Sequence, residues 1–210
     1  MSLVRVFLGG EGRNELGGRA GHSVYPSEEP GVIETLLRGC QPDGWQVCGS
    51  TPWCKITKFA AKGPTPREER NVLGLVLMAK RAQSHVVAFV RDADTDKDRP
   101  IVIDAAIRKA DETFPGIDVI GGTAVPVLEA WVLAMRGERG TEAMSKVDAK
   151  RRLDEVGAAD TAAMVEAARR VVVDKISQDA RGLRRWLLKA SDALPRRVNA
   201  ARSTSARQPA

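Results

Sequence analysis

Residues 85–90 (HVVAFV) limit the fold of this chain more than any other segment. All but the first are apolar, so both faces of a strand built from them would be buried. Strands buried on both faces occur in the middle of parallel sheets that helices cover on each side. We therefore expect an α/β protein with a mostly parallel sheet flanked by helices, and with residues 85–90 near the centre of that sheet.

The rest of the first 140 residues alternates between strand and helix patterns. Apolar periodicity predicts further strands at 3–8, 45–58 and 117–120, and helices at 30–38, 66–83, 100–113 and 124–135. From residue 145 the pattern is helical. We expect three parts: an α/β domain at 1–140, a helical appendage at 141–193 and a basic, disordered tail at 194–210.

Four aspartates stand within seven positions directly after residues 85–90; they are Asp92, Asp94, Asp96 and Asp98. Crowded carboxylates repel one another, and a divalent cation offsets that repulsion. A calcium EF-hand is excluded, because its sixth and twelfth positions require Gly and Glu, where this chain has Lys97 and Ile103. Since open α/β sheets bind ligands at the carboxyl ends of strands, this loop is a candidate metal site. The alternative is a solvated loop in which Asp98 caps the next helix.

A glycine-rich turn carrying Glu11 and Glu15 follows the first expected strand. It is not a dinucleotide-binding turn, because Glu15 stands where the last glycine is required. A Walker loop is excluded as well, since the chain continues with Gly-Gly-Arg and not with Gly-Lys-Ser/Thr. If the turn is helical, the four-residue spacing places both carboxylates on one side. The alternative is a mobile surface loop.

Glu129 is the only charged residue in the apolar stretch 124–135. A lone buried carboxylate is costly unless it has a partner. A metal ion or a basic side chain such as Arg136 would serve as that partner.

Together, these three segments resemble the TOPRIM fold, which topoisomerases, bacterial primases and OLD-type nucleases share. TOPRIM domains have a Glu after the first strand, matched by Glu11, and a D-x-D after a later strand, matched by Asp92 and Asp94. Small stand-alone and OLD-type members add a Glu in an E-G-x-T-E-like turn and a helical E-A-hydrophobic element, matched by Glu15 and Glu129. The resemblance covers about residues 1–135, with Asn14 in place of the usual Thr.

The resemblance implies a nuclease that uses Mg²⁺ or Mn²⁺. The metal ligands it implies are Asp92, Asp94, Glu11, Glu15 and Glu129, with Glu11 also a candidate general base. OLD-type nucleases also have a catalytic Lys, for which Lys146, Lys150 and Lys175 are all candidates. A topoisomerase is not expected, because the only tyrosine, Tyr25, falls in an expected loop. Since small TOPRIM proteins of this kind are often associated with an ATPase, the resemblance also implies a partner ATPase and a role in defence against phages or mobile elements.

Basic residues gather at the end of the chain. Residues 181–210 hold eight Lys and Arg and one Asp, a charge of +7 that leaves −1 for residues 1–180. Such a segment is typical of nucleic-acid contact, and the candidates are Arg181, Arg184, Arg185, Arg196 and Arg197. The alternative is a solvated tail that binds nothing.

Other features of the sequence predict a cytoplasmic protein. The apolar segments are too short for export or for spanning a membrane, and the three cysteines lack the spacing of a zinc site. Self-association is a further expectation. Two alternative functions stay open: a non-catalytic module that binds nucleic acid or a partner, and a hydrolase of small phosphate esters.

Overall fold

Four parallel strands form the middle layer of the protein. The computed structural model describes residues 3–21, 29–60 and 63–205. The strands are β1 (Val4–Gly10), β2 (Trp45–Pro52), β3 (Val86–Asp92) and β4 (Asp118–Ala124), in the order β2-β1-β3-β4. Every neighbouring pair is parallel, and β3 lies between β1 and β4. The predicted α/β fold, with residues 85–90 inside a parallel sheet, is confirmed.

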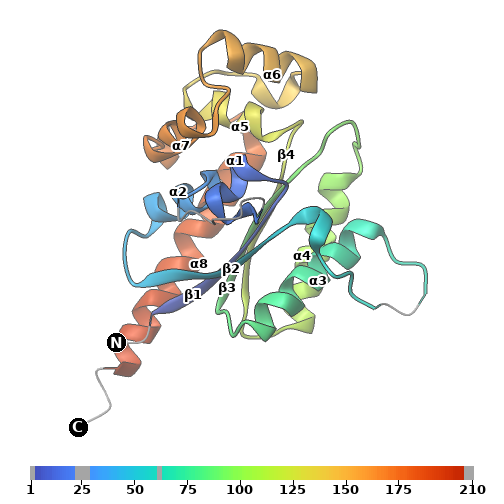
Figure 1. Ribbon diagram of the computed structural model, residues 1–210, viewed down its shortest axis with the longest axis vertical. Coiled ribbons are helices and arrows are strands. Elements are labelled where there is room, and N and C mark those ends of the chain that lie inside the picture. Colours follow the sequence, from blue (N-terminus) through green and yellow to red (C-terminus); the bar gives the residue numbers. More distant parts are fainter. Residues whose placement is uncertain (1–2, 22–28, 61–62, 206–210) are drawn as a thin grey trace.

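Alternate residues of the central strands supply two separate apolar cores. Val86, Ala88 and Val90 face one core, and Val87 and Phe89 face the other. On the Phe89 side the sheet is covered by α3 (Arg67–Arg81) and α4 (Arg99–Thr113); on the opposite side lie α2 (Val32–Cys40) and α8 (Arg181–Ser205) (Figure 1). The result is a three-layer structure whose middle strands are buried on both faces.

The remaining helices gather at the end of the sheet where the strands terminate (Figure 1). They are α1 (Arg13–Leu16), α5 (Leu128–Met135), α6 (Lys146–Glu155) and α7 (Thr161–Arg169). Short 3-10 turns complete the described elements: η1 (Gly17–Ala20), η2 (Trp53–Lys55), η3 (Thr141–Ala143) and η4 (Val173–Lys175).

The tail expected from residue 194 is helical as far as Ser205, whereas the division at residue 140 stays a prediction. Helix α8 runs through residue 194 to Ser205, and Leu183, Trp186, Leu194 and Val198 are buried in the same core as the sheet. The Trp186 indole N–H donates to the Phe89 carbonyl at 3.0 Å. Apolar residues recur at three- and four-residue steps across this segment, so burial favours a helix even through its proline and arginines. Residues 206–210 of the expected tail lie outside the described part.

Other boundaries also differ from the prediction, and β2 ends at Pro52 instead of residue 58. Strand β4 continues to Ala124 and α5 begins only at Leu128, whereas a helix was expected from residue 124. Strand β4 stays paired with β3 as far as Ala124, which lies opposite Asp92, and glycine at 121 leaves room for the Phe89 ring, which a Cβ would approach to 2.2 Å. The expected loop after β1 contains α1 and η1, and Tyr25 lies outside the described residues.

In the described part of the chain, no helix is both long and apolar enough to cross a bilayer. Cys40, Cys48 and Cys54 are all free thiols.

Candidate functional site

The strand order reverses between β1 and β3. From β1 the chain crosses to β2 on one side, and from β3 it crosses to β4 on the other. Ligands of open α/β sheets bind outside the carboxyl ends of the strands at such a point. Glu11 follows the last residue of β1, Asp92 is the last residue of β3, and the Asp92 main-chain N–H donates to Glu11 Oε1 at 3.2 Å. Two of the segments that the sequence singles out therefore meet here.

Glu15 and Asp92 are buried beside this point and Glu129 is partly buried, and together they are called the buried trio. Asp92 is 9% exposed, Glu15 6% and the Glu129 side chain 14%, although they come from three distant segments. The Leu128 N–H, at the start of α5, donates to Asp92 Oδ1 at 2.9 Å. Burial, together with the negative charges of Glu15 and Glu129, raises the pKa of Asp92 to about 7. A cation placed among these carboxylates would favour their ionised forms.

Gly10 lets Glu15 pack closely against the end of β1. A Cβ at Gly10 would lie only 2.5 Å from the Cβ of Glu15. The Gly12 N–H donates to Glu15 Oε2 at 2.9 Å, closing the turn that begins α1. Burial raises the pKa of Glu15 despite this bond. The turn is helical at Glu15, but α1 begins at Arg13 and Glu11 lies before it, so the helical spacing does not relate the two acids.

In the described part of the chain Glu11 and Asp94, unlike Glu15 and Asp92, form ion pairs with basic side chains, and we call them the paired acids. Asp94 Oδ2 accepts from Arg99 Nη1 at 2.8 Å, and Oδ1 accepts from Lys146 Nζ at 2.6 Å. Burial alone would raise the pKa of Asp94, but the hydrogen bonds from Lys146 and Arg99 lower it. Glu11 forms an ion pair with Arg91. Within the chain, basic side chains already offset the charges of both acids.

The other aspartates of the loop also differ from the expectation. Asp98 occupies the position before α4 but makes no capping bond with its side chain. Asp96 Oδ1 accepts instead from the N–H groups of Asp98 and Arg99, at 3.0 and 3.1 Å. Asp96, and not Asp98 as the solvated-loop alternative predicts, therefore accepts the N–H groups at the start of α4.

Two of the three candidate lysines reach the site, both from α6. Lys146 contacts Asp94 as described above, and Lys150 Nζ lies 3.5 Å from Glu129 Oε1. The basic partner of Glu129 is thus Lys150 and not Arg136, which donates to the Val156 carbonyl. Lys175 ends η4 and makes no ion pair in the described part of the chain.

The sequence interpretation missed the roles of Arg91, Arg99 and Glu68. Both arginines flank the acidic loop, and Glu68 lies in the first turn of α3. Glu68 Oε1 lies 3.4 Å from Arg91 Nη2 and 3.5 Å from Arg99 Nε. Arginines on either side of four aspartates were a signal for internal pairing. No sequence signal linked Glu68 to them, because α3 is distant in sequence from both β1 and the loop.

The buried trio fits a divalent cation in its chemistry. Magnesium takes hard oxygen ligands, and the trio supplies carboxylates with excess negative charge. Across residues 3–21, 29–60 and 63–205, no three Asp, Glu, His or Cys side chains converge closely enough to hold a metal ion as they stand. Of the five predicted ligands, the trio is the better match, since basic side chains engage Glu11 and Asp94.

The arginines expected to bind nucleic acid are spread along α8. Arg196 and Arg197 pair with Asp118, the first residue of β4, at 3.6 and 2.6 Å, so they lie at the opposite end of the sheet from the trio. Arg185 pairs with Asp104 at 2.7 Å. Arg184 donates to the Ile176 carbonyl at 2.7 Å. Only the start of α8, with Arg181 and Arg184, is near the carboxyl end of β4.

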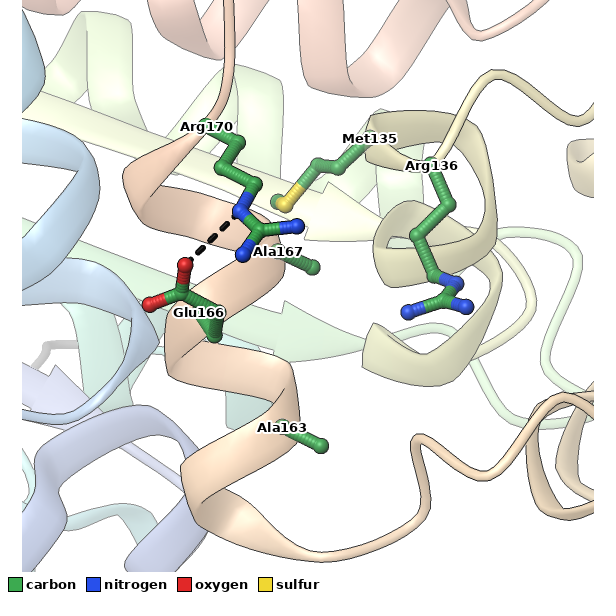
Figure 2. A pocket seen from close by; sticks show the side chains of 6 residues that line it. All are labelled: Met135, Arg136, Ala163, Glu166, Ala167 and Arg170. Carbon is green, nitrogen blue, oxygen red and sulfur yellow. Dashed lines mark hydrogen bonds and ion pairs between the residues drawn. The ribbon is translucent and has the colours of Figure 1, made fainter.

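A cavity of about 400 Å³ lies between α5 and α7, apart from the carboxylates. Figure 2 shows Arg170 bonded to Glu166 on α7, with Met135 and Arg136 contributed by the α5 side. It contains none of the predicted site residues. We therefore place the candidate site at the strand ends, on the evidence of burial and charge.

Comparison of the chain with protein-family models, with curated proteins and with solved structures finds no match.

Proposed function

We propose that this chain is a Mg²⁺- or Mn²⁺-dependent nuclease of the TOPRIM type. The observation that carries the proposal is the buried trio, which lies at the point where the strand order reverses. Burial and the charges of Glu15 and Glu129 raise the pKa of Asp92 to about 7, so its ionised form is costly to the fold, and a site for a divalent cation gives that cost a function. The adjacency of Glu11 and Asp92 supports the TOPRIM resemblance, which places acids at these two strand ends.

In this proposal Asp92, Glu15 and Glu129 hold the cation. A bound divalent cation neutralises a phosphate and lowers the pKa of water. Glu11 is the proposed general base, and its Oε1 is held by Arg91 and the Asp92 N–H. Lys146 and Lys150, with side chains 41% and 51% exposed, are positioned at the mouth of the site to contact the phosphates of a substrate.

The substrate class in this proposal is DNA or RNA. Arg181 and Arg184 are the predicted nucleic-acid residues nearest the proposed site, whereas Arg185, Arg196 and Arg197 would contact substrate only after leaving their internal partners. A partner ATPase, self-association and a role in phage or mobile-element defence come from the resemblance alone.

Cleavage assays test the proposal directly. Wild type is incubated with labelled single- and double-stranded DNA and RNA, with Mg²⁺, Mn²⁺ or EDTA. We expect Asp92→Asn to lower cleavage at least ~100-fold, because it removes a charged ligand from the proposed metal site. The matched control is Asp98→Asn in the same loop, an exposed position without a capping bond, which should cleave like wild type. Metal-independent cleavage, or equal cleavage by all three proteins, would refute the proposal.

A non-catalytic binding module is the second candidate function. It is favoured by the paired acids, since Asp94 has both oxygens engaged by Arg99 and Lys146. In that case the acidic loop is structural, and Asp92→Asn leaves nucleic-acid affinity unchanged in EDTA while wild type shows no cleavage. Filter binding at two salt concentrations, alongside the cleavage assay, separates the two functions.

A further inference from the structure

Glu68 lies at the centre of a charge network that the sequence did not indicate. It comes from the first turn of α3, and its side chain is only 14% exposed. Glu68 Oε2 accepts from the Trp53 indole N–H at 2.9 Å and from Asn71 Nδ2 at 3.3 Å. Its other oxygen is left to the two arginines. Both oxygens of this buried acid are therefore in use.

Each arginine joins Glu68 to one of the paired acids. Arg91 lies 3.4 Å from Glu68 Oε1 and forms the ion pair with Glu11. Arg99 Nε lies 3.5 Å from the same oxygen, while Arg99 Nη1 bonds to Asp94 and to the Asp92 carbonyl at 2.8 and 2.7 Å. Arg99 Nε is buried and makes no hydrogen bond, so its attraction to Glu68 is one of charge. A single carboxylate thus lies between two guanidinium groups.

The two arginines need an acid between them. Burial and the neighbouring charge of Arg99 lower the pKa of Arg91, which means that the two cations repel each other. Without the charge of Glu68, each guanidinium would be drawn more strongly to its remaining acid, Glu11 or Asp94. The local potential would also become more positive beside the buried trio. Both effects oppose the binding of a cation at this end of the sheet.

We propose that Glu68 is a positioning residue, which holds Arg91 and Arg99 and so sets where the carboxylates of Glu11 and Asp94 lie. It touches none of the proposed metal ligands that form the buried trio. Its effect on them passes through the two arginines. The part of this inference that concerns cation affinity rests on the proposed function.

The test compares Glu68→Gln with Glu69→Gln. Glutamine keeps the size of Glu68 and an acceptor for Trp53 but removes the charge. Glu69 is the matched control, because it is the next residue of the same helix turn, has a side chain 16% exposed and pairs with Lys109. Mn²⁺ affinity is measured by calorimetry, and thermal unfolding followed by circular dichroism shows that each variant folds. We expect Glu68→Gln to weaken Mn²⁺ binding ~10-fold, because the local potential beside the buried trio becomes more positive, and Glu69→Gln to leave it unchanged.

Unchanged Mn²⁺ affinity in Glu68→Gln would overturn the inference and leave the proposed metal site intact. If wild type itself binds no Mn²⁺, the proposed function fails, and a second measurement on the metal-free protein decides the inference. The Nε–Hε NMR signals of Arg91 and Arg99, assigned with Arg91→Lys and Arg99→Lys, should exchange slowly in wild type and in Glu69→Gln. They should exchange at least ~5-fold faster in Glu68→Gln, and equal rates in all three would overturn the positioning role.

Discussion

The buried trio and the paired acids lie at the same end of the sheet, but they differ in how far basic side chains offset their negative charges. Arg91, Arg99 and Lys146 offset the charges of Glu11 and Asp94. Among the described residues, the ion pair found for the trio is that of Glu129 with Lys150, whose side chain is half exposed. A carboxylate with basic partners stabilises the folded state when ionised, whereas a buried carboxylate among other acids destabilises it. The difference indicates which acids serve the fold and which are candidates for binding a ligand.

The largest effect on stability is expected for Asp92→Asn at high pH, and it tests this difference directly. The pKa of Asp92 rises from 3.8 unfolded to about 7 folded, so the folded state keeps a proton that the unfolded chain releases. Stability is therefore lost as the pH rises from about 4 to 7, and the loss is complete above 7. We expect Asp92→Asn to raise the free energy of unfolding by about 2 to 4 kcal/mol at pH 8 and to change it little at pH 4.

Urea unfolding of wild type and variant at the two pH values measures this effect. A destabilised variant at pH 8 would mean that Asp92 has an ion-pair partner in solution, and the contrast between the two sets of acids would be lost.

The second largest effect is expected from a divalent cation, which should stabilise the folded protein by binding at the trio. If Mg²⁺ binds there, a concentration thirty times its Kd raises the free energy of unfolding by about 2 kcal/mol, because the ligand binds only the folded state. The Tm of wild type at pH 8 should rise accordingly, and that of Asp92→Asn should not. A Tm increase that survives in Asp92→Asn would place the cation elsewhere.

Asp94→Asn should have the opposite sign to Asp92→Asn. It removes the charge-assisted bonds from Arg99 and Lys146, which should cost about 1 to 2 kcal/mol. Asparagine tolerates the left-handed backbone at this position, where φ is 55°, so the loss reflects charge and not strain. Since the folded pKa of Asp94 lies below 3.8, its contribution is present above that pH and is lost as the pH falls further. Equal stability of variant and wild type at pH 7 would show that the pairing contributes nothing.

The smallest effect is expected for Lys150→Gln. Exposed ion pairs contribute little, so the loss should be about 0.5 kcal/mol or less. Lys175→Gln is the control, since Lys175 makes no ion pair in the described part of the chain. Both lysine variants are then measured again in the Asp92→Asn background. The trio carries one negative charge fewer there, so Lys150→Gln should lower the free energy of unfolding by less. A loss above ~1 kcal/mol would show that the trio is better compensated than its burial indicates.

The features of the fold and of the site that could be predicted from the sequence are those that depend on residues close together along the chain. Residues 85–90 gave the parallel sheet because burial on both faces is encoded locally in their side chains. The position of Asp92 followed from the strand before it. The pairing of Glu68 with Arg91 and Arg99 depends on the packing of α3 beside the sheet, which no local pattern encodes.

The end of the chain was misread for a related reason. Its arginines and proline have the composition of a disordered segment. Leu183, Trp186, Leu194 and Val198 nevertheless keep a helical period, and their burial against the sheet decides the outcome. Truncation after Leu194, which would test a free tail, would here remove Val198 from the core.

The position of α8 has a consequence for the order in which the protein can fold during synthesis. The sheet is complete once β4 has been made, but one of its faces is still without the helix that covers much of it. Trp186 and Val198 reach that face only after all four strands have been made, so shorter chains expose apolar strand surface to water. Ribosome-bound chains that stop before residue 181 should therefore depend on chaperones, and independence should be reached only once residues up to about 198 have left the ribosome.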